Sequence, residues 1–354
     1  MAFEDLAIIL TWPDATIRGD EKWMMFFKRI GIVKNLNFKV GHTGVVLVKR
    51  ATGEMYFYDF GRYITPRGYG RARSKDSDPR LSIGVKAIFQ DNKISNLPEI
   101  LAHFEQMKPA MYGEGRLFFN IAEDINFESA KAYGDDCVLQ GTYPYGAVAR
   151  NNNNCSRFIT RMLMKSSLRY HYWHGINIPE TIKASPISNI VNVNKLREVN
   201  SFSPEEGIKT FKMNRFQSFF FLAKQLGDNV FHRKASLLPN DIIIGAVKFA
   251  SKPISVPKMA KYLGGVGDGA WYFLHERSDS QIEISRYTSN GQLEYVVLGE
   301  ASEAIDFSAD WDIAYDSHLL FTHIVQKGQK IKINHVETLP LEDYKYKNLQ
   351  ERYA

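Results

Sequence analysis

Cysteine is nearly absent from this chain, since Cys137 and Cys155 are the only two among its 354 residues. Two cysteines cannot build a disulfide framework, and Cys137 has no partner pattern around it. The sequence therefore excludes the disulfide-rich secreted class of small proteins and is compatible with a reducing compartment.

Long apolar runs are missing as well. No segment approaches the roughly 20 consecutive apolar residues of a membrane-spanning helix. The N-terminal stretch MAFEDLAIILTWPD also lacks the basic residues and the cleavage site of a signal peptide. We therefore expect no transmembrane segment and a cytoplasmic location, with export by another route left open.

A strong excess of either charge is also absent. The net charge of +6 arises from 45 basic and 39 acidic residues, which suits anionic partners but is far below the density of a dedicated nucleic-acid binder. What the chain does have is apolar and aromatic residues, at 44% and 13% of the sequence. These fractions are typical of a globular protein with a large core.

The length and the order of patterns predict an α+β protein of two domains. Strand-like and helix-like segments alternate through the first domain, which we place at residues 1–205. The second domain, residues 206–354, opens with a predicted helix over 209–228. It then consists mostly of short strands, including one at 241–249, with one further helix near 256–263.

The stretch NNNNCSRF, residues 151–158, predicts the start of a helix. Asparagine suits helix N-caps better than helix interiors, and the apolar residues of the following FITRML repeat at helical spacing. With Asn153 or Asn154 as the N-cap, Cys155 lies in the first turn. The unpaired N–H groups there favour a thiolate and can hold an oxyanion, so Cys155 is a candidate nucleophile. The alternative is a small apolar side chain that merely falls at a helix start.

A thiol nucleophile needs a base nearby and a third polar group that orients the base. His42 begins the predicted strand GHTGVVLV, between Gly41 and Gly44, which leave the backbone around the imidazole open. If the hairpin turns near residues 51–52, Asp59 lies opposite or diagonal to His42 on the same face. Asp59 is therefore the candidate orienting group. The alternative is a hairpin that merely carries two polar residues at its open end.

Residues 61–80, GRYITPRGYGRARSKDSDPR, are predicted to form a long loop that borders this site. Guanidinium groups match carboxylates and phosphates in geometry, so we expect four arginines to bind the substrate: Arg62, Arg67, Arg71 and Arg73. The alternative is a solvated loop whose arginines pair with Asp76 and Asp78. Because GYGRAR lacks the third glycine of a dinucleotide motif and no metal-ligand array is found, we expect no cofactor and no metal.

The segment GHTGVVLVKRATGEMYFYDFGRY, followed about a hundred residues later by NCSRFITRML, resembles the permuted branch of the papain-like superfamily. That branch includes NlpC-type amidases and lecithin retinol acyltransferase-like enzymes, and DFGRY, GYGRAR, YGEGRL and NCSRF resemble a bacterial group within it. The resemblance covers roughly residues 1–175. It implies a permuted papain-like fold with Cys155 as nucleophile, His42 as base and Asp59 as orienting residue.

The function that this resemblance implies is a cysteine-dependent hydrolase or acyltransferase that acts through a thioester on Cys155. A peptide amide, such as one from peptidoglycan, is the first expected substrate, and a lipid acyl group is the second. The alternative is a non-catalytic binding protein of the same fold that recognises an anionic ligand. The role of the second domain and the oligomeric state stay open.

Overall fold

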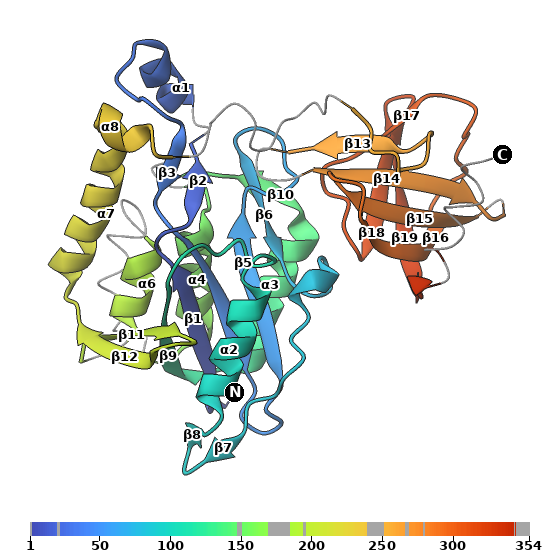
Figure 1. Cartoon of the computed structure of the whole chain (residues 1–354). Helices are drawn as coiled ribbons and strands as arrows, with labels where there is room; N and C mark the ends of the chain where they lie inside the picture. Colours follow the sequence, from blue (N-terminus) through green and yellow to red (C-terminus); the bar gives the residue numbers. More distant parts are fainter. Residues whose placement is uncertain are drawn as a thin grey trace.

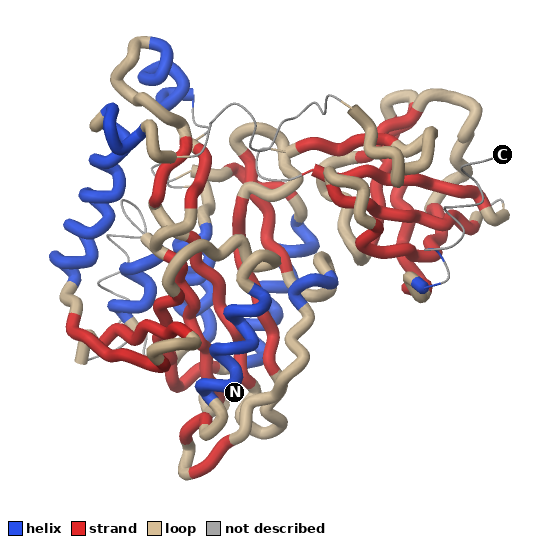
Figure 2. The backbone as a smooth tube through the Cα atoms, in the orientation of Figure 1, coloured by secondary structure: helices blue, strands red, loops and turns tan. Residues whose placement is uncertain are grey.

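The computed structural model describes residues 2–19, 22–146, 151–168, 185–193, 196–238, 251–265, 269–278, 280–342 and 344. The chain is α+β, as the sequence predicts. Figure 1 shows a larger unit in which helices flank a central sheet, and a separate C-terminal unit made of strands. In Figure 2 the helices, in blue, gather around the larger unit, whereas the C-terminal unit consists mainly of strands and the loops that join them.

The central sheet has eight antiparallel strands in the order β10-β6-β5-β4-β1-β9-β11-β12. Its strands are β1 (Asp5–Trp12), β4 (His42–Val48), β5 (Met55–Gly61), β6 (Tyr69–Arg73), β9 (Leu117–Ile125), β10 (Thr142–Pro144), β11 (Glu198–Ser203) and β12 (Gly207–Lys212). Strand β6 lies within the predicted loop 61–80. That loop prediction was therefore wrong over Tyr69–Arg73, where pairing with β5 outweighs the local glycine content.

Both faces of the central sheet are covered. Ala7 and Ile9 of β1 pack on one face with α3 (Phe127–Gln140), α4 (Cys155–Ser166) and α6 (Pro186–Asn192). Leu6, Ile8 and Leu10 pack on the other face with α2 (Leu97–Met107). Burial on two sides explains why β1 reads as a continuous apolar run instead of an alternating one. Each fully buried large side chain contributes about 1.5–3 kcal/mol.

A smaller layer covers the end of β1. It comprises β2 (Thr16–Arg18), β3 (Asn37–Lys39), α1 (Lys22–Arg29), α7 (Arg215–Val230) and α8 (His232–Ala235). Helix α7 packs on β3 and α6. The short elements η1 (Pro79–Leu81), β7 (Phe89–Gln90) and β8 (Lys93–Ile94) complete the larger unit.

Helix α7 begins later than the helix predicted over 209–228. Residues 207–212 pair with β11 instead, and Asn214 caps α7 by accepting a hydrogen bond of 2.9 Å from the backbone N–H of Gln217. Strand β12 thus pairs within the central sheet, and α7 packs on α6 and β3.

The C-terminal sheet has seven antiparallel strands in the order β13-β14-β15-β16-β19-β18-β17. They are β13 (Lys261–Gly264), β14 (Gly269–Glu276), β15 (Gln281–Thr288), β16 (Leu293–Ala301), β17 (Trp311–Ile313), β18 (Phe321–Gln326) and β19 (Gln329–Leu339). The edge strands β13 and β17 contact each other, so the sheet curls almost into a barrel around an aliphatic core. The strand predicted at 241–249 lies outside the described residues.

The helix predicted near 256–263 is not formed. Pro253 and Pro257 each begin a turn, closed by hydrogen bonds from the N–H groups of Val256 and Ala260, and the chain then enters β13. Pairing of residues 261–264 with β14 outweighs the local helical spacing, which explains the difference. None of the helices that the structure describes has the length and apolar character needed to cross a membrane.

Candidate active site

Cys155 is the first residue of α4. The preceding Asn154 has an extended backbone, and its side chain accepts a hydrogen bond of 2.8 Å from the N–H of Arg157, which makes it the N-cap that the sequence predicts. The Cys155 backbone N–H therefore belongs to the unpaired first turn. Cys155 is buried, yet it lines a cavity of about 400 Å³ together with Ser156.

His42 is the first residue of β4, and Asp59 lies on β5. In the hairpin, Gly44 is opposite Asp59, so His42 and Asp59 are diagonal neighbours on one face, as the register argument predicts. The His42 Nε2 atom lies 3.2 Å from the Asp59 Oδ2 atom. Both side chains are buried.

The two glycines beside His42 have structural roles. Gly41 has a φ of +81°, and a Cβ atom there would lie 2.9 Å from the backbone of Trp12 and Pro13. A Cβ atom at Gly44 would overlap the ring of Phe57. Gly41 lines the cavity at Cys155, but Gly44 is required by packing within the sheet and does not open the backbone to a ligand.

The Cys155 thiol lies close enough to His42 to affect the pKa of the imidazole. Burial alone lowers the pKa of His42, but the hydrogen bonds to Asp59 and Cys155 and the charges of both raise it from 6.5 to about 9. Since Nε2 faces Asp59, the other ring nitrogen, Nδ1, is the atom that can exchange a proton with the thiol. The structure thus brings Cys155, His42 and Asp59 together.

Asp59 is held by more groups than the sequence indicates. Arg73 donates to both of its oxygens, from Nε at 3.1 Å and from Nη2 at 2.7 Å, and the Tyr63 hydroxyl donates at 2.5 Å. Burial raises the pKa of Asp59, but the Arg73 charge and the hydrogen bonds from His42 and Arg73 hold it below its usual value. The carboxylate is therefore fixed in its charged form.

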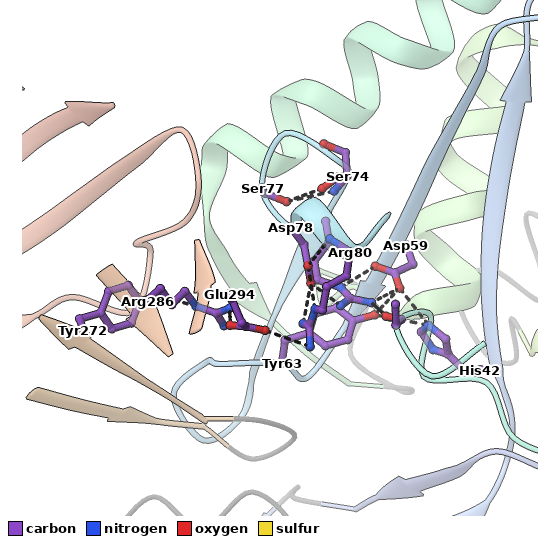
Figure 3. Close-up of polar contacts among 12 residues, drawn as sticks. His42, Asp59, Tyr63, Ser74, Ser77, Asp78, Arg80, Tyr272, Arg286 and Glu294 are labelled. Carbon is purple, nitrogen blue, oxygen red and sulfur yellow. Dashed lines mark hydrogen bonds and ion pairs between the residues drawn. The ribbon is translucent and has the colours of Figure 1, made fainter. Parts of the chain in front are cut away.

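The charged contacts continue into the C-terminal sheet, as Figure 3 shows. Arg73 also donates to Asp78 at 2.9 Å, and Asp78 accepts from Arg80 at 2.7 Å. Arg80 lies 3.4 Å from Glu294 on β16, which pairs with Arg286 on β15. We call this chain of residues from Asp59 to Arg286 the ionic network. It connects the candidate triad with the second sheet.

Tyr145 is a site residue that the sequence analysis missed. Its side chain lies beside Cys155 and lines the same cavity, and burial followed by the charge of Cys155 raises the pKa of the phenol. The Arg62 guanidinium lies 4.3 Å from the ring centroid. Tyr145 follows β10 in an irregular segment before the asparagines, where sequence patterning carries no signal for it.

The four arginines that were predicted to bind the substrate lie in different parts of the structure. Arg62 lines the cavity at Cys155, and Arg67 is exposed and donates to Met25. Arg71 instead donates at 2.9 Å to the carbonyl of Ser317 in the C-terminal unit, and Arg73 binds Asp59. Both Arg71 and Arg73 are buried, and neither lines the cavity at Cys155. Arg73 pairs with Asp59 and Asp78, whereas among the described residues Arg71 meets only carbonyl oxygens and its Nε has no hydrogen-bond partner.

Among the described residues, no group of three or more His, Cys, Asp or Glu side chains is placed to hold a metal ion. Cys155, His42 and Asp59 supply the reactive groups of this site. A buried imidazole, raised in basicity and held by a carboxylate, lies beside a thiol at a helix start, which is the arrangement that activates a cysteine nucleophile.

Comparisons with known protein families match two parts of the chain, and the first of these holds the candidate triad. A family model described as type VI secretion system effector TseH-like matches residues 7–172, which include all three members of the candidate triad. A second model, the DUF6695 C-terminal domain, matches residues 260–336. No curated protein matches the chain.

One solved structure is similar to part of this chain. It is the crystal structure of the type VI secretion system effector TseH, at 16% identity and a TM-score of 0.39, covering 60% of this chain and 100% of the TseH chain. The N-terminal part of the protein is thus similar to TseH-like effectors, and its C-terminal part is similar to a separate family of domains.

Proposed function

We propose that the protein is a cysteine-dependent hydrolase of amide or ester bonds, with a permuted papain-like catalytic domain. The observation that carries the proposal is that Cys155, His42 and Asp59 lie together. The match of residues 7–172 to TseH-like effectors supports a role as an effector of a type VI secretion system. The sequence resemblance to NlpC-type amidases supports hydrolysis as the chemistry.

In the first step His42 Nδ1 takes the thiol proton, and the Cys155 sulfur attacks the carbonyl carbon of the substrate. The carbonyl π electrons move to oxygen, and the Cys155 backbone N–H can hold that oxyanion, with the neighbouring Tyr145 hydroxyl as a second donor. When the intermediate collapses, the bond to the leaving amine or alcohol breaks, and imidazolium gives that group its proton. An acyl thioester on Cys155 remains.

In the second step His42 deprotonates a water molecule, which attacks the thioester carbonyl. The C–S bond breaks, the carboxylic acid leaves, and the thiol is restored. An acceptor amine or alcohol in place of water would make the same site an acyltransferase. Asp59 keeps the imidazole oriented and stabilises its protonated form throughout.

The test is the alkylation of the two cysteines by iodoacetamide, followed by mass spectrometry at several pH values. Cys155 is expected to react faster than Cys137 at pH 7, because burial raises the pKa of the Cys137 thiol whereas His42 activates Cys155. The rate at Cys155 is expected to fall in His42→Ala, with Cys137 as the internal control. A Cys155 that reacts no faster than Cys137, or equally fast without His42, would refute the proposal and favour a binding protein.

A further inference from the structure

The cavity at Cys155 is unusually apolar for a site that cuts a polar bond. Its walls include Ile17 of β2, Trp23 and Met24 of α1, Phe38 of β3, and Val40, which follows β3. Its volume of about 400 Å³ lies in the range of small-molecule sites. We call this cavity the acyl groove.

Helix α7 forms the other wall of the acyl groove. It contributes Phe219, Leu222, Ala223 and Leu226 to the lining, which follow the i, i+3, i+4, i+7 spacing of one helix face. This apolar face looks toward Cys155 across the cavity instead of being buried in a protein core. Phe219 is 40% exposed and Leu226 is 44% exposed, so the groove opens to solvent.

The wall is held in place at both ends of α7. Arg215 Nε donates to Asn192 at 2.9 Å, and Gln225 Nε2 donates to the carbonyl of Pro13 at 2.5 Å. Beyond the helix, Asn35 donates to the carbonyl of Ala235 at 3.3 Å. The apolar face is therefore positioned by specific contacts with the larger unit, and the groove is preformed.

The polar side chains of the lining are few, and most belong to the reacting end. Asn154, Cys155 and Ser156 are consecutive at the start of α4, and Arg62 lies over Tyr145 beside them. Arg18 and Ser185 are the other polar residues of the lining. No Asp or Glu is among the described residues that line the groove. A peptide in such a groove would leave its N–H and C=O groups without partners along the apolar walls, which costs free energy, whereas a hydrocarbon would not.

We propose that the acyl part of the substrate is a hydrocarbon chain of medium to long length, held in the acyl groove with its ester or amide carbonyl at Cys155. The inference rests on the proposed hydrolase function and names its substrate class. The thioester formed on Cys155 then carries a fatty acyl group. Water releases that group as a fatty acid.

The activity test uses p-nitrophenyl esters of acetate, butyrate, octanoate and dodecanoate below their critical micelle concentrations. Each buried methylene contributes up to about fourfold in binding, so kcat/KM is expected to rise at least about tenfold from acetate to octanoate. Equal rates for all chain lengths would overturn the acyl-chain inference while leaving the hydrolase intact. So would faster cleavage of the anilide of an N-acylated leucine than of the octanoate ester.

Two adjacent phenylalanines of α7 provide a matched pair of variants. Phe219 lines the groove, whereas Phe220 is 66% exposed and does not line it. Phe219→Asp is expected to lower the octanoate-to-acetate ratio of kcat/KM at least about tenfold, and Phe220→Asp is expected to leave the ratio unchanged. Equal effects of the two changes would contradict the assignment.

A binding measurement separates this inference from the hydrolase proposal. Titration calorimetry of Cys155→Ala with dodecanoate is expected to show binding that Phe219→Asp, made in the same background, weakens at least about tenfold. If dodecanoate binds but no ester is cleaved by the native protein, the groove assignment stands and the hydrolase proposal fails. If esters are cleaved but dodecanoate does not bind, the groove assignment fails and the hydrolase proposal stands.

Discussion

The two sides of the His42 imidazole are built from opposite kinds of residue. On the Cys155 side lies the acyl groove, with apolar walls and an opening to solvent. On the Asp59 side lies the ionic network, in which Asp59 is completely buried and each charged group meets another protein group. The cavity beside the ionic network holds only about 30 Å³, against about 400 Å³ for the acyl groove, so the first side has the room for a substrate and the second side positions the base.

The charges of the ionic network support this division. Three carboxylates, Asp59, Asp78 and Glu294, face three guanidinium groups, and protonated His42 adds one further positive charge at the end of the row. A thiolate at Cys155 would balance that charge. The ionic network therefore stabilises an ion pair between Cys155 and His42, at the end of the network next to the acyl groove.

The largest effect is expected from replacing Cys155 or His42, which lie between the acyl groove and the ionic network. Cys155→Ala and His42→Ala are each expected to lower kcat/KM for the best acyl ester by about 10³-fold or more, because one removes the nucleophile and the other its base. Cys137→Ala is the control and is expected to retain full activity. Circular dichroism checks that each variant is folded; residual activity near the native level in either would show that another residue carries the reaction.

The ionic network is expected to matter most for stability. Arg73→Met would leave Asp59 buried without its main partner and is expected to lower the free energy of unfolding by about 3–5 kcal/mol. The matched control is Arg116→Met, because Arg116 pairs with Asp14 while its side chain is 64% exposed; that change is expected to cost about 0–1 kcal/mol. Urea denaturation measures both, and equal losses would mean that the network is not positioned as described.

The raised pKa of His42 predicts a pH dependence of stability. The pKa of the folded state, about 9, lies above the ordinary value of 6.5, so the contribution is complete below pH 6.5 and is lost as the pH rises through 9. At about 1.4 kcal/mol per pH unit, this group contributes about 3 kcal/mol. The stability difference between the native protein and His42→Gln is therefore expected to shrink by that amount between pH 6.5 and 9.5. A difference that stays constant over this range would contradict the ion pair.

The groove and the network were not equally predictable from the sequence. Cys155 and its cap depend on neighbours within three residues, and the His42–Asp59 contact depends on one hairpin register. Such local features are readable from residue type and spacing. The candidate triad was therefore accessible without the structure, and so was the α+β class.

The parts that escaped prediction depend on distant pairing. Arg73 lies opposite Asp59 across β5 and β6, but the glycines around it made β6 read as a loop. Arg71 meets the carbonyl of Ser317, 246 positions later in the chain. The place of the apolar face of α7 at the cavity of Cys155 arises from packing on β3 and α6, and helical periodicity does not show which surface a face will cover.

The smallest effect is expected at Tyr145, which lines the acyl groove beside Cys155. Tyr145→Phe keeps the ring under Arg62 but removes the hydroxyl beside Cys155, so it is expected to lower kcat by about 10- to 100-fold with little change in KM. The control is Tyr143→Phe on β10, a tyrosine that does not line the groove. A change in KM alone would make Tyr145 a wall of the groove. A loss confined to kcat would make it part of the reacting end, since only a transition-state interaction alters the rate without altering substrate binding.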